Sequence, residues 1–517
     1  MSGAAKPAGA DAIDLAGLTV DRVQAGLTEG AFTCESLTQA CLDRIAVYNP
    51  RYNAIIFLNA DAMADAREID RRRATGETLG PLAGVPAVVK DTMDMKGLPT
   101  TGGWSLLCGK TGGIDLFPAT DAPVVERLRS AGAIILGKTN VPILSHTGSH
   151  ANDSWAGPTF NAAAPDLLPG GSSAGSATAV AAGFAVLGLA EETGGSIQNP
   201  AAAQALVGIK PTFALVPNTG VMPLSSLRDV VGPIARSVRD AALALDVLAG
   251  FTMADAKTVA AIGRRPSGGY AARLGTATLQ GKRIGLYGPG WRDQPLSAET
   301  ERLYHRAQSE MTAQGAVLVE DPFRASGFAS LRSPISGDYD ARGLESVPYD
   351  LHKYLERLGP GAALKTFAQF AKATASQDPF ARDGVLNYMP LMPGFPACLA
   401  DPETPPDMAS FVAARETHLQ IFNAVFAEKK LDALVFPQMR SALASREGDD
   451  GIRETTVNEI NIAGLPGVVV PAGYHEGGAP FCLILVGPQW SEADLLGLAH
   501  AYEQATKHRR PPELTRG

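Results

Sequence analysis

Short apolar segments alternate with helical patterns between residues 121 and 206, and this alternation constrains the fold more than any other feature of the chain. Asp121 is expected to be the N-cap of a helix, and Gly132 suits the position just after its end. Val124, Val125 and Leu128 supply its apolar face. The pattern continues with a strand at 133–136, a helix at 173–184, a strand at 185–190 and a helix at 201–206. Helices and strands in alternation predict a layered α/β core.

The remainder of the chain is expected to add to this core on both sides. Residues 14–73 have a helical pattern, so we expect residues 1–75 to form an N-terminal helical segment packed on the core. Residues 325–410 are irregular and rich in proline, which suggests an insertion or a long surface excursion. Further strands are predicted at 283–287, 433–436, 468–471 and 482–486, and further helices at 407–430 and 492–504.

Composition excludes several classes of protein. Lys and Arg number 45 against 53 Asp and Glu, giving a net charge of −8, which argues against sequence-independent nucleic-acid binding. The five cysteines have no CxxC spacing, so neither a disulfide framework nor a structural zinc site is expected. The longest apolar stretch, 177–190, is shorter than the roughly 20 residues of a membrane span. With no apolar leader near the N-terminus, we expect a cytoplasmic protein that binds no membrane.

Residues 132–139, GAIILGKT, match the letters of a phosphate-binding loop. Such a loop must follow a strand and open a helix, with its backbone N–H groups free to hold phosphate. Here the four middle residues are themselves strand-like, and Pro142 follows soon after. We therefore expect a strand and no nucleotide site at this position.

A Gly/Ser loop, GGSSAGS at 170–176, lies between Pro169 and an Ala-rich helical segment. It is either a flexible turn or a set of hydroxyls and N–H donors placed at a helix N-terminus. Gly171 to Gly175 also fits the G-x-S-x-G nucleophile elbow, which would make Ser173 the nucleophile. That motif needs a preceding strand and a histidine, but 163–170 is a poor strand and no histidine has a local signature.

Two further positions carry chemistry. Gly194 and Gly195 let the backbone bend beside Ser196, so a hydroxyl lies next to exposed N–H donors, as acyl transfer requires. The alternative is a Gly-Gly turn with a structural serine. Lys90 ends an apolar strand at 85–89 and is either a solvated strand end or a buried lysine able to act as a base.

These motifs, in this order, resemble the amidase signature family of serine hydrolases. The resemblance is strong over about 80–250, weaker over 452–505 and poor over 255–450. It implies an α/β fold with a mixed twisted β-sheet core flanked by helices on both faces. It also implies a single catalytic domain over 76–505, in which 325–410 is a variable insertion on the substrate side. The matching segments are 84–92, 121–142, 169–183, 193–202, 208–212, 232–241 and 461–473.

The resemblance implies a role for each matching residue. Ser196 would be the nucleophile, Ser172 the bridging serine after a cis peptide bond, and Lys90 the base. The backbone amides of Thr193, Gly194, Gly195 and Ser196 would form the oxyanion hole, and Ser173, Glu192 and Gln198 would lie around this site. No metal and no cofactor are implied.

The chain departs from the family pattern at two of these positions. Glu192 stands where the family usually has Asp, and Gln198 where it often has Arg. Because neither 198 nor 199 is Arg, we expect an uncharged substrate: a carboxamide, an anilide, or a related carbamate or ester, as in urethane cleavage. The cluster Tyr388, Met389, Leu391, Met392 and Phe395 is either an apolar substrate pocket or plain packing.

Two other activities remain as alternatives. The chain could be the glutamine-hydrolysing subunit of an amidotransferase complex, since the family includes such subunits. It could also be an esterase of the α/β-hydrolase type with Ser173 as nucleophile. The expected partner is otherwise a small amide or carbamate substrate, and the protein is expected to be a monomer or a homodimer.

Overall fold

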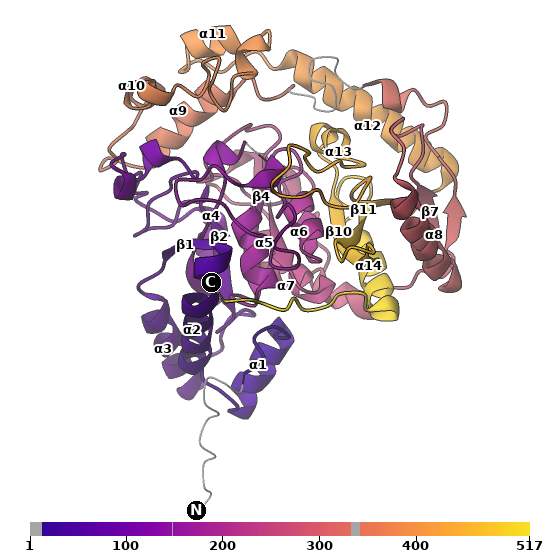
Figure 1. Cartoon of the computed structure of the whole chain (residues 1–517), viewed down its shortest axis with the longest axis horizontal. Coiled ribbons are helices and arrows are strands. Elements are labelled where there is room, and N and C mark those ends of the chain that lie inside the picture. Colours follow the sequence, from indigo (N-terminus) through magenta and orange to yellow (C-terminus); the bar gives the residue numbers. More distant parts are fainter. Residues whose placement is uncertain (1–12, 147, 332–341, 517) are drawn as a thin grey trace, which may run out of the picture.

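A computed structural model describes residues 13–146, 148–331 and 342–516 of the chain. Its central feature is one mixed sheet of eleven strands, in the order β1-β3-β2-β4-β6-β5-β10-β11-β9-β7-β8 (Figure 1). The strands are β1 (Ile55–Leu58), β2 (Pro86–Lys90), β3 (Ile134–Thr139), β4 (Leu187–Glu192), β5 (Val207–Lys210), β6 (Val230–Ala235), β7 (Arg283–Leu286), β8 (Val317–Val319), β9 (Ala433–Pro437), β10 (Gly467–Tyr474) and β11 (Pro480–Val486).

This sheet combines parallel and antiparallel pairs. Strand β2 runs parallel to β3 on one side and to β4 on the other, so the ends of β2 and β4 point the same way. The next pairs, from β4–β6 to β9–β11, are antiparallel, and β7 is parallel to both β8 and β9. The predicted α/β fold with a mixed sheet is confirmed.

Helices pack on the sheet and beyond its edges (Figure 1). They are α1 (Val20–Glu29), α2 (Cys34–Tyr52), α3 (Ala62–Ala74), α4 (Pro123–Ser130), α5 (Ala174–Ala181), α6 (Gln198–Ala203), α7 (Val238–Leu248), α8 (Ala298–Ala313), α9 (Val347–Arg357), α10 (Phe367–Ala373), α11 (Phe395–Ala400), α12 (Ala409–Lys429), α13 (Asn458–Ala463) and α14 (Glu492–Thr506). In the part of the chain that the structure describes, no helix is both long and apolar enough to cross a bilayer.

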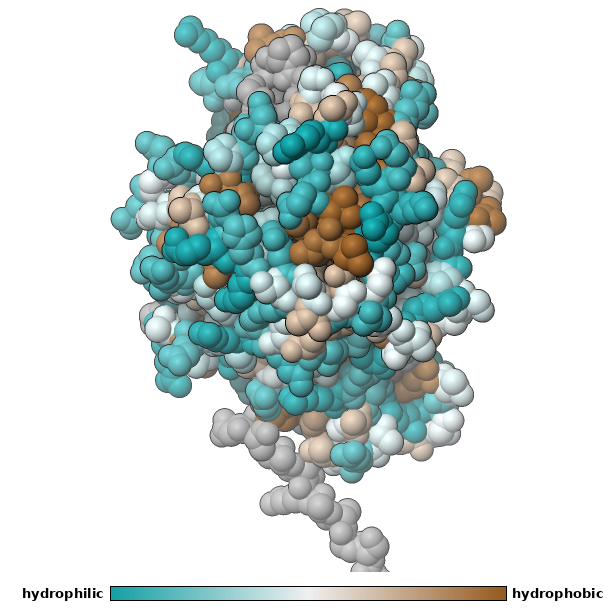
Figure 2. All heavy atoms as spheres, turned by 90° about the vertical axis from the view of Figure 1, so that its right-hand side faces the viewer, coloured by the Kyte–Doolittle hydropathy of each residue, from teal (hydrophilic) through white to brown (hydrophobic). Residues whose placement is uncertain are grey.

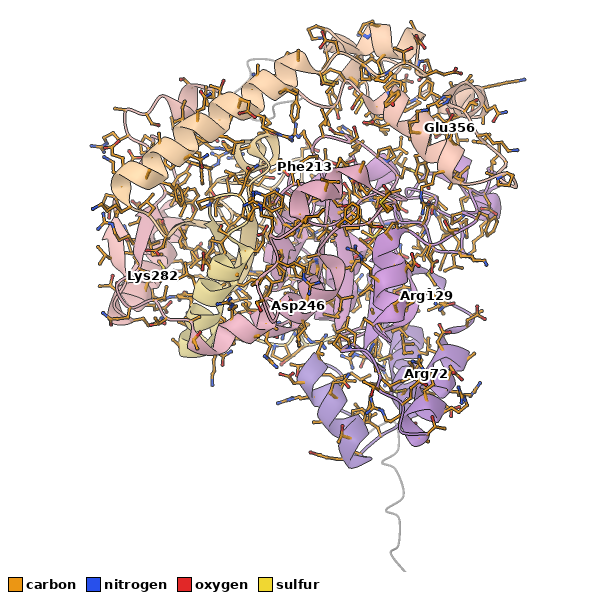
Figure 3. All side chains as sticks on the ribbon, turned by 180° about the vertical axis from the view of Figure 1, so that it is seen from behind. Arg72, Arg129, Phe213, Asp246, Lys282 and Glu356 are labelled. Atoms are coloured by element: carbon orange, nitrogen blue, oxygen red, sulfur yellow. The ribbon has the colours of Figure 1, made fainter. Side chains whose placement is uncertain are left out.

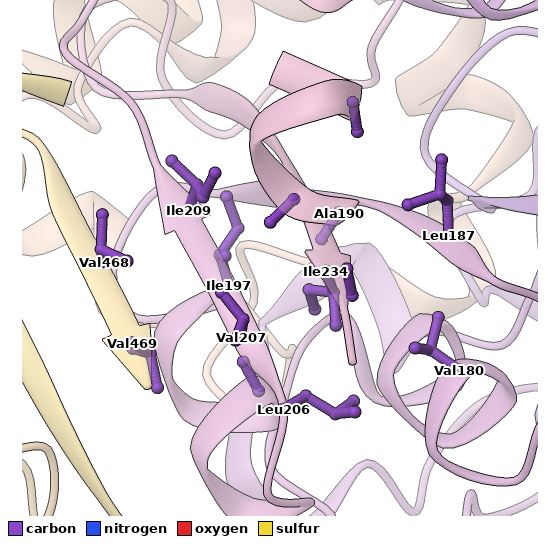
Figure 4. Packing of buried hydrophobic residues seen from close by; sticks show 14 of the residues in the cluster. Val180, Leu187, Ala190, Ile197, Leu206, Val207, Ile209, Ile234, Val468 and Val469 are labelled. Atoms are coloured by element: carbon purple, nitrogen blue, oxygen red, sulfur yellow. The ribbon is translucent and has the colours of Figure 1, made fainter. Parts of the chain in front are cut away.

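Small residues allow α5 to lie deep in the core. Every residue of its sequence AGSATAVA is buried, and the helix contacts β2, β3, β4 and β6. At Gly175 a Cβ atom would overlap the backbone of Ala54 and Asn140, so only glycine permits this approach. Around α5, branched side chains of the central strands interlock, including Leu187, Val207 and Ile234 (Figure 4).

A second, smaller hydrophobic cluster lies at the top of Figure 1, where α9, α10 and α11 gather. We call residues 344–400 the cover. Its buried side chains, such as Leu355 and Phe370, pack on Trp104, Leu144 and Met222 from the core's own loops. From behind, Figure 3 shows Glu356 on the cover and Arg72 on α3 at the opposite end of the molecule. A side view shows a mostly hydrophilic surface with a small hydrophobic patch near its centre (Figure 2).

Three expectations about the elements need correction. The N-cap of α4 is Ala122; the Asp121 side chain instead accepts a hydrogen bond from Lys96 N at 2.7 Å and pairs with Arg129. The segment 14–73 is not purely helical, because β1 pairs antiparallel with β3. The proline-rich stretch 325–410 contains the helices of the cover, and α9 has a helical pattern of buried apolar residues at Val347, Leu351 and Leu355 that was overlooked among the prolines.

Candidate active site

Lys90, Ser172 and Ser196 form a chain of close polar contacts. Lys90 Nζ lies 2.8 Å from Ser172 Oγ, and Ser172 Oγ lies 2.9 Å from Ser196 Oγ. Lys90 and Ser172 are fully buried, whereas Ser196 keeps 8% of its surface exposed. The chain therefore begins at a buried amine, passes through a buried hydroxyl and ends at the Ser196 hydroxyl, which solvent or a substrate can reach.

Three backbone features hold this chain in place. Lys90 is the last residue of β2, and Ser196 lies in the loop that leaves β4. Ser172 follows a cis peptide bond from Gly171 and precedes the first turn of α5. A Cβ atom at Gly171 would overlap the carbonyl oxygen of Gly148, so glycine is required there. Because β2 and β4 are parallel neighbours, Lys90 at the end of β2 lies close to the loop that leaves β4.

The loop before Ser196 presents unused backbone donors. Among the described residues, none accepts a hydrogen bond from the backbone N–H groups of residues 193–196. Gly195 has φ of +93°, a conformation that favours glycine. These N–H groups meet the requirement for stabilising a developing oxyanion beside the Ser196 hydroxyl.

Glu192 and Gln198 brace this loop from behind. The Glu192 carboxylate accepts hydrogen bonds from Ile197 N at 2.8 Å, Gln198 N at 3.1 Å, the Gln198 side chain and Asn461 Nδ2. Gln198 is fully buried behind the loop, so its side chain lies beside the site without lining the cavity. The next residue, Asn199, lines the pocket instead.

Ser173 and Lys138 take structural positions. The Ser173 hydroxyl is buried and donates to the carbonyl oxygen of Glu191 at 3.2 Å. None of the described strands leads directly into Ser173, as a nucleophile elbow would require. Lys138 lies within β3, pairs with Asp91 at 2.8 Å and donates to Pro99 O at 2.7 Å. The segment that matches a phosphate loop is thus a strand, and its lysine is engaged by the protein.

A cavity of about 210 Å³ opens at Ser196. Its described lining contains no Lys or Arg, and burial lowers the pKa of its one histidine, His146, to about 4, so that the ring is neutral at neutral pH. Glu454 also lines the cavity, and Asn199 Nδ2 donates to its carboxylate at 2.6 Å. The lining residues are Ser145, His146, Gly148, Ser149, Gly171, Thr193, Gly194, Ser196, Asn199, Leu224 and Glu454.

An aromatic side chain of the cover contacts a residue that lines this cavity. Tyr388 stacks on His146, with 4.8 Å between ring centroids, and its hydroxyl lies 3.2 Å from His146 Nδ1. Met389, Met392 and Phe395 are buried in the cover's own cluster, and Leu391 is 73% exposed. Of the five residues considered as a pocket, four therefore pack or face solvent.

Glu191 was not expected to take part in this site. Its carboxylate lies 2.8 Å from Lys90 Nζ, and both side chains are buried. The signal in the sequence was two successive acidic residues, Glu191 and Glu192, at the end of an apolar strand. Alternation along a strand sends them to opposite sides, but a resemblance to known motifs draws attention to Glu192 alone.

No cluster of three or more His, Cys, Asp or Glu side chains with the spacing of a metal site occurs among the described residues. The chemistry available at the site is that of an amine, two hydroxyls, a carboxylate and backbone N–H donors.

The fold and the site together define a class: α/β proteins in which a buried lysine, a serine after a cis peptide bond and an accessible serine are connected. The family model described as Amidase matches residues 36–344, and the chain belongs to the amidase signature family. A peptide amidase from Stenotrophomonas maltophilia is similar in structure, with a TM-score of 0.79 and 34% identity over 97% of this chain and 99% of that one.

Similar sequences include two kinds of protein. A probable amidase of Arabidopsis thaliana is 31% identical over 505 residues, covering 96% of this chain and 91% of its own. A glutamyl-tRNA(Gln) amidotransferase subunit of Moorella thermoacetica is 32% identical over 516 residues, covering 96% of this chain and 98% of its own. Membership of the family is therefore secure, while the relatives named do not share a single substrate.

Proposed function

We propose that this protein is a serine amidase that hydrolyses uncharged amides through Ser196, Ser172 and Lys90. The observation that carries the proposal is the continuous chain of contacts from Lys90 Nζ through Ser172 Oγ to Ser196 Oγ, which ends in the cavity. Each link is short enough for direct proton transfer.

The reaction follows from the residue types. Ser196 Oγ attacks the carbonyl carbon while its proton passes to Ser172 Oγ, and the Ser172 proton passes to the neutral amine of Lys90. The oxyanion that forms accepts hydrogen bonds from loop N–H groups among residues 193–196. When the C–N bond breaks, the relay returns a proton to the leaving amine. Water then attacks the acyl-enzyme by the same relay and releases the acid.

The cavity favours substrates without a carboxylate. No described lining residue carries a positive charge at neutral pH, so a substrate carboxylate would find no opposite charge there, and burial raises the pKa of Glu454, the acidic residue of the lining. Uncharged carboxamides, anilides and related carbamates or esters fit this lining, so urethane cleavage is within the proposed range. The proposal needs no cofactor and places the enzyme in the cytoplasm as a monomer or a homodimer.

An amidotransferase role is the second candidate, because the Moorella thermoacetica relative, which belongs to such a complex, is 32% identical over nearly its whole length. Free glutamine carries an α-carboxylate, for which the described lining offers no cation, and an α-ammonium, for which it offers only Glu454. Hydrolysis of glutamine and of simple uncharged amides by the purified chain separates the two roles. Turnover of glutamine alone would favour the amidotransferase role.

The proposal is tested by labelling the protein with a fluorophosphonate and locating the adduct by tandem mass spectrometry. One tryptic peptide contains both serine loops, so a second cleavage after Glu191 or Glu192 is required. We expect the adduct on Ser196, and Ser196→Ala should lower amide hydrolysis by at least about 10⁴-fold. An adduct on Ser173, or a fully active Ser196→Ala protein, would refute the proposal.

A further inference from the structure

The amine of Lys90 has three oxygen neighbours, and two of them belong to Glu191. Lys90 Nζ lies 2.8 Å from Ser172 Oγ, 2.8 Å from Glu191 Oε2 and 3.2 Å from the Glu191 carbonyl oxygen. The Lys90 and Glu191 side chains are 0% and 2% exposed, so water does not screen their interaction. One residue therefore supplies most of the polar environment of the proposed base.

A count of donors and acceptors shows what Glu191 does to a neutral lysine. A neutral amine has two N–H groups and one lone pair, whereas a carbonyl oxygen and a carboxylate oxygen can only accept. The two N–H groups must therefore point to Glu191, and the lone pair is left facing Ser172 Oγ. This is the orientation in which the amine can accept the Ser172 proton.

The same contact acts on the charge that the reaction creates. Once the Ser172 proton reaches Lys90, a buried ammonium forms 2.8 Å from the Glu191 carboxylate. An opposite charge at this distance in a buried site stabilises the ammonium strongly. The carboxylate is in place with or without a substrate, so the contact is built into the site and does not form during the reaction.

The other charged groups near Lys90 are already engaged. Asp91, its neighbour on β2, pairs with Lys138 of β3. Glu192 on β4 accepts its hydrogen bonds from the loop and from Asn461 of α13. Asp229 lies just before β6 and is linked to Glu191 through Thr193. The Thr193 hydroxyl lies 2.6 Å from Asp229 Oδ1 and 3.1 Å from Glu191 Oε1. Burial, followed by the charge of Glu191, raises the pKa of Asp229, which favours its neutral form.

We propose that Glu191 is the positioning residue of the relay: it orients the Lys90 lone pair toward Ser172 and balances the ammonium that forms, setting the pH at which Ser196 becomes reactive. This inference rests on the proposed function and extends it by one residue. No substrate contact is assigned to Glu191, because the residue is buried behind Lys90 and does not line the cavity.

The test measures the second-order rate constant of fluorophosphonate labelling at Ser196 between pH 5 and 10. The Ser196 oxygen–phosphorus bond forms, fluoride leaves, and the Ser196 proton passes through Ser172 to Lys90, so the rate follows the relay without a known substrate. In Glu191→Gln the acidic limb of the profile should move about one to three pH units lower, because the charge that favours the ammonium is gone. The plateau rate should fall about 10-fold or more, because the ammonium formed in the reaction loses its partner.

Matched variants separate this effect from a general disturbance. Glu191→Asp keeps the charge and should keep the limb close to that of the wild type. Glu192→Gln removes the adjacent carboxylate, which does not contact Lys90, and should leave the limb in place even if it lowers the rate. Glu191→Ser removes the charge with a smaller side chain, leaves room for water, and serves if Glu191→Gln does not fold.

The outcomes are decisive either way. A limb that moves in Glu191→Gln or Glu191→Ser but not in Glu191→Asp or Glu192→Gln supports the inference. An unmoved limb in a folded Glu191→Gln protein, or an equal shift in Glu192→Gln, overturns it. If the inference fails while Ser196→Ala still abolishes labelling, the proposed function stands alone. If labelling does not depend on Ser196, the proposed function has failed first.

Discussion

The site is held together by hydrogen bonds, whereas the cover is held together by apolar packing. The site is made of loops at the ends of β2 and β4, and its buried polar groups contact one another over 2.8 to 3.2 Å. The cover is made of short helices around an apolar cluster, and its Tyr388 contacts His146 in the lining of the cavity. The part of the molecule that would perform chemistry is thus held by hydrogen bonds, while the cover, which we expect on the substrate side, is held mainly by packing.

This difference predicts that variants of the two regions fail in different ways. Changes in the polar loops should lower the reaction rate with little change in stability. Changes in the cover should alter stability and substrate binding before they alter the chemical step.

Apart from loss of the Ser196 hydroxyl itself, the largest expected effect comes from Gly195→Ala. The positive φ of this position strains any residue with a side chain, and a Cβ atom there would lie 2.8 Å from Asn199 Nδ2, so we expect the loop to shift and its N–H donors to move away from the oxyanion. We expect kcat to fall about 10²- to 10³-fold. Kinetics on an anilide substrate, with a thermal melt as control, measure this. Unchanged kcat in a folded variant would show that the loop is not the oxyanion hole.

Leu355→Ala should instead destabilise the protein. Leu355 is fully buried in the cover's cluster, so its truncation should lower the free energy of unfolding by about 2–5 kcal/mol. Urea denaturation followed by fluorescence measures the loss, and the rate of fluorophosphonate labelling in native buffer should change little. A large loss of labelling in the folded variant would mean that the cover also holds the relay in place.

Tyr388→Ala should affect substrate binding more than the chemical step. The variant removes both the stacking on His146 and the hydroxyl contact at 3.2 Å, so His146, which lines the cavity, loses two of the contacts that hold its ring. We expect KM for bulky anilides to rise about 3- to 10-fold, in keeping with an aromatic pair worth about 0.5–1.5 kcal/mol, while kcat stays nearly constant. The opposite pattern, a lower kcat at constant KM, would place Tyr388 in the chemical step.

His146→Phe should have the smallest effect and should appear only in the pH dependence of stability. Burial lowers the pKa of His146 to about 4, while an unfolded histidine titrates near 6.5. Between these values the unfolded state binds more protons, so wild-type stability should fall as the pH drops from about 6.5 to 4.

The phenylalanine keeps a ring for Tyr388 and removes the titrating group, so the variant should lose less stability on acidification. Denaturation midpoints at pH 4.5, 5.5 and 6.5 test this. Parallel pH curves for the two proteins would show that His146 is not buried as a neutral ring.

The core of the fold could be predicted from sequence because its residues carry local signals. The helix and strand from 121 to 142 correspond to α4 and β3, and the apolar run at 177–190 corresponds to α5 and β4. The structure brings Lys90, Ser172 and Ser196 together, as the resemblance implied, although their catalytic roles remain proposals. The division into segments 1–75 and 76–505 likewise stays a prediction.

The rest of the fold and of the site could not be predicted, because it depends on contacts between residues far apart in the chain. His146 and Glu454 line one cavity although 308 positions separate them, and neither lies in a motif. Glu191 was overlooked because its role comes from the side of the strand on which it lies and from a lysine 101 positions earlier. Strand β1 is only four residues long, and its pairing with β3 rather than any periodicity determines it.

The small residues of α5 also bear on how this protein can change over time. Because every side chain of that helix is buried against strands, and Ser172 stands two residues before its start, almost any larger residue there would displace the serine loop. We therefore expect this helix to tolerate very few substitutions. New substrate preferences, whether selected in nature or in the laboratory, are then expected to accumulate in the cover, where side chains can be exchanged without moving the reacting groups.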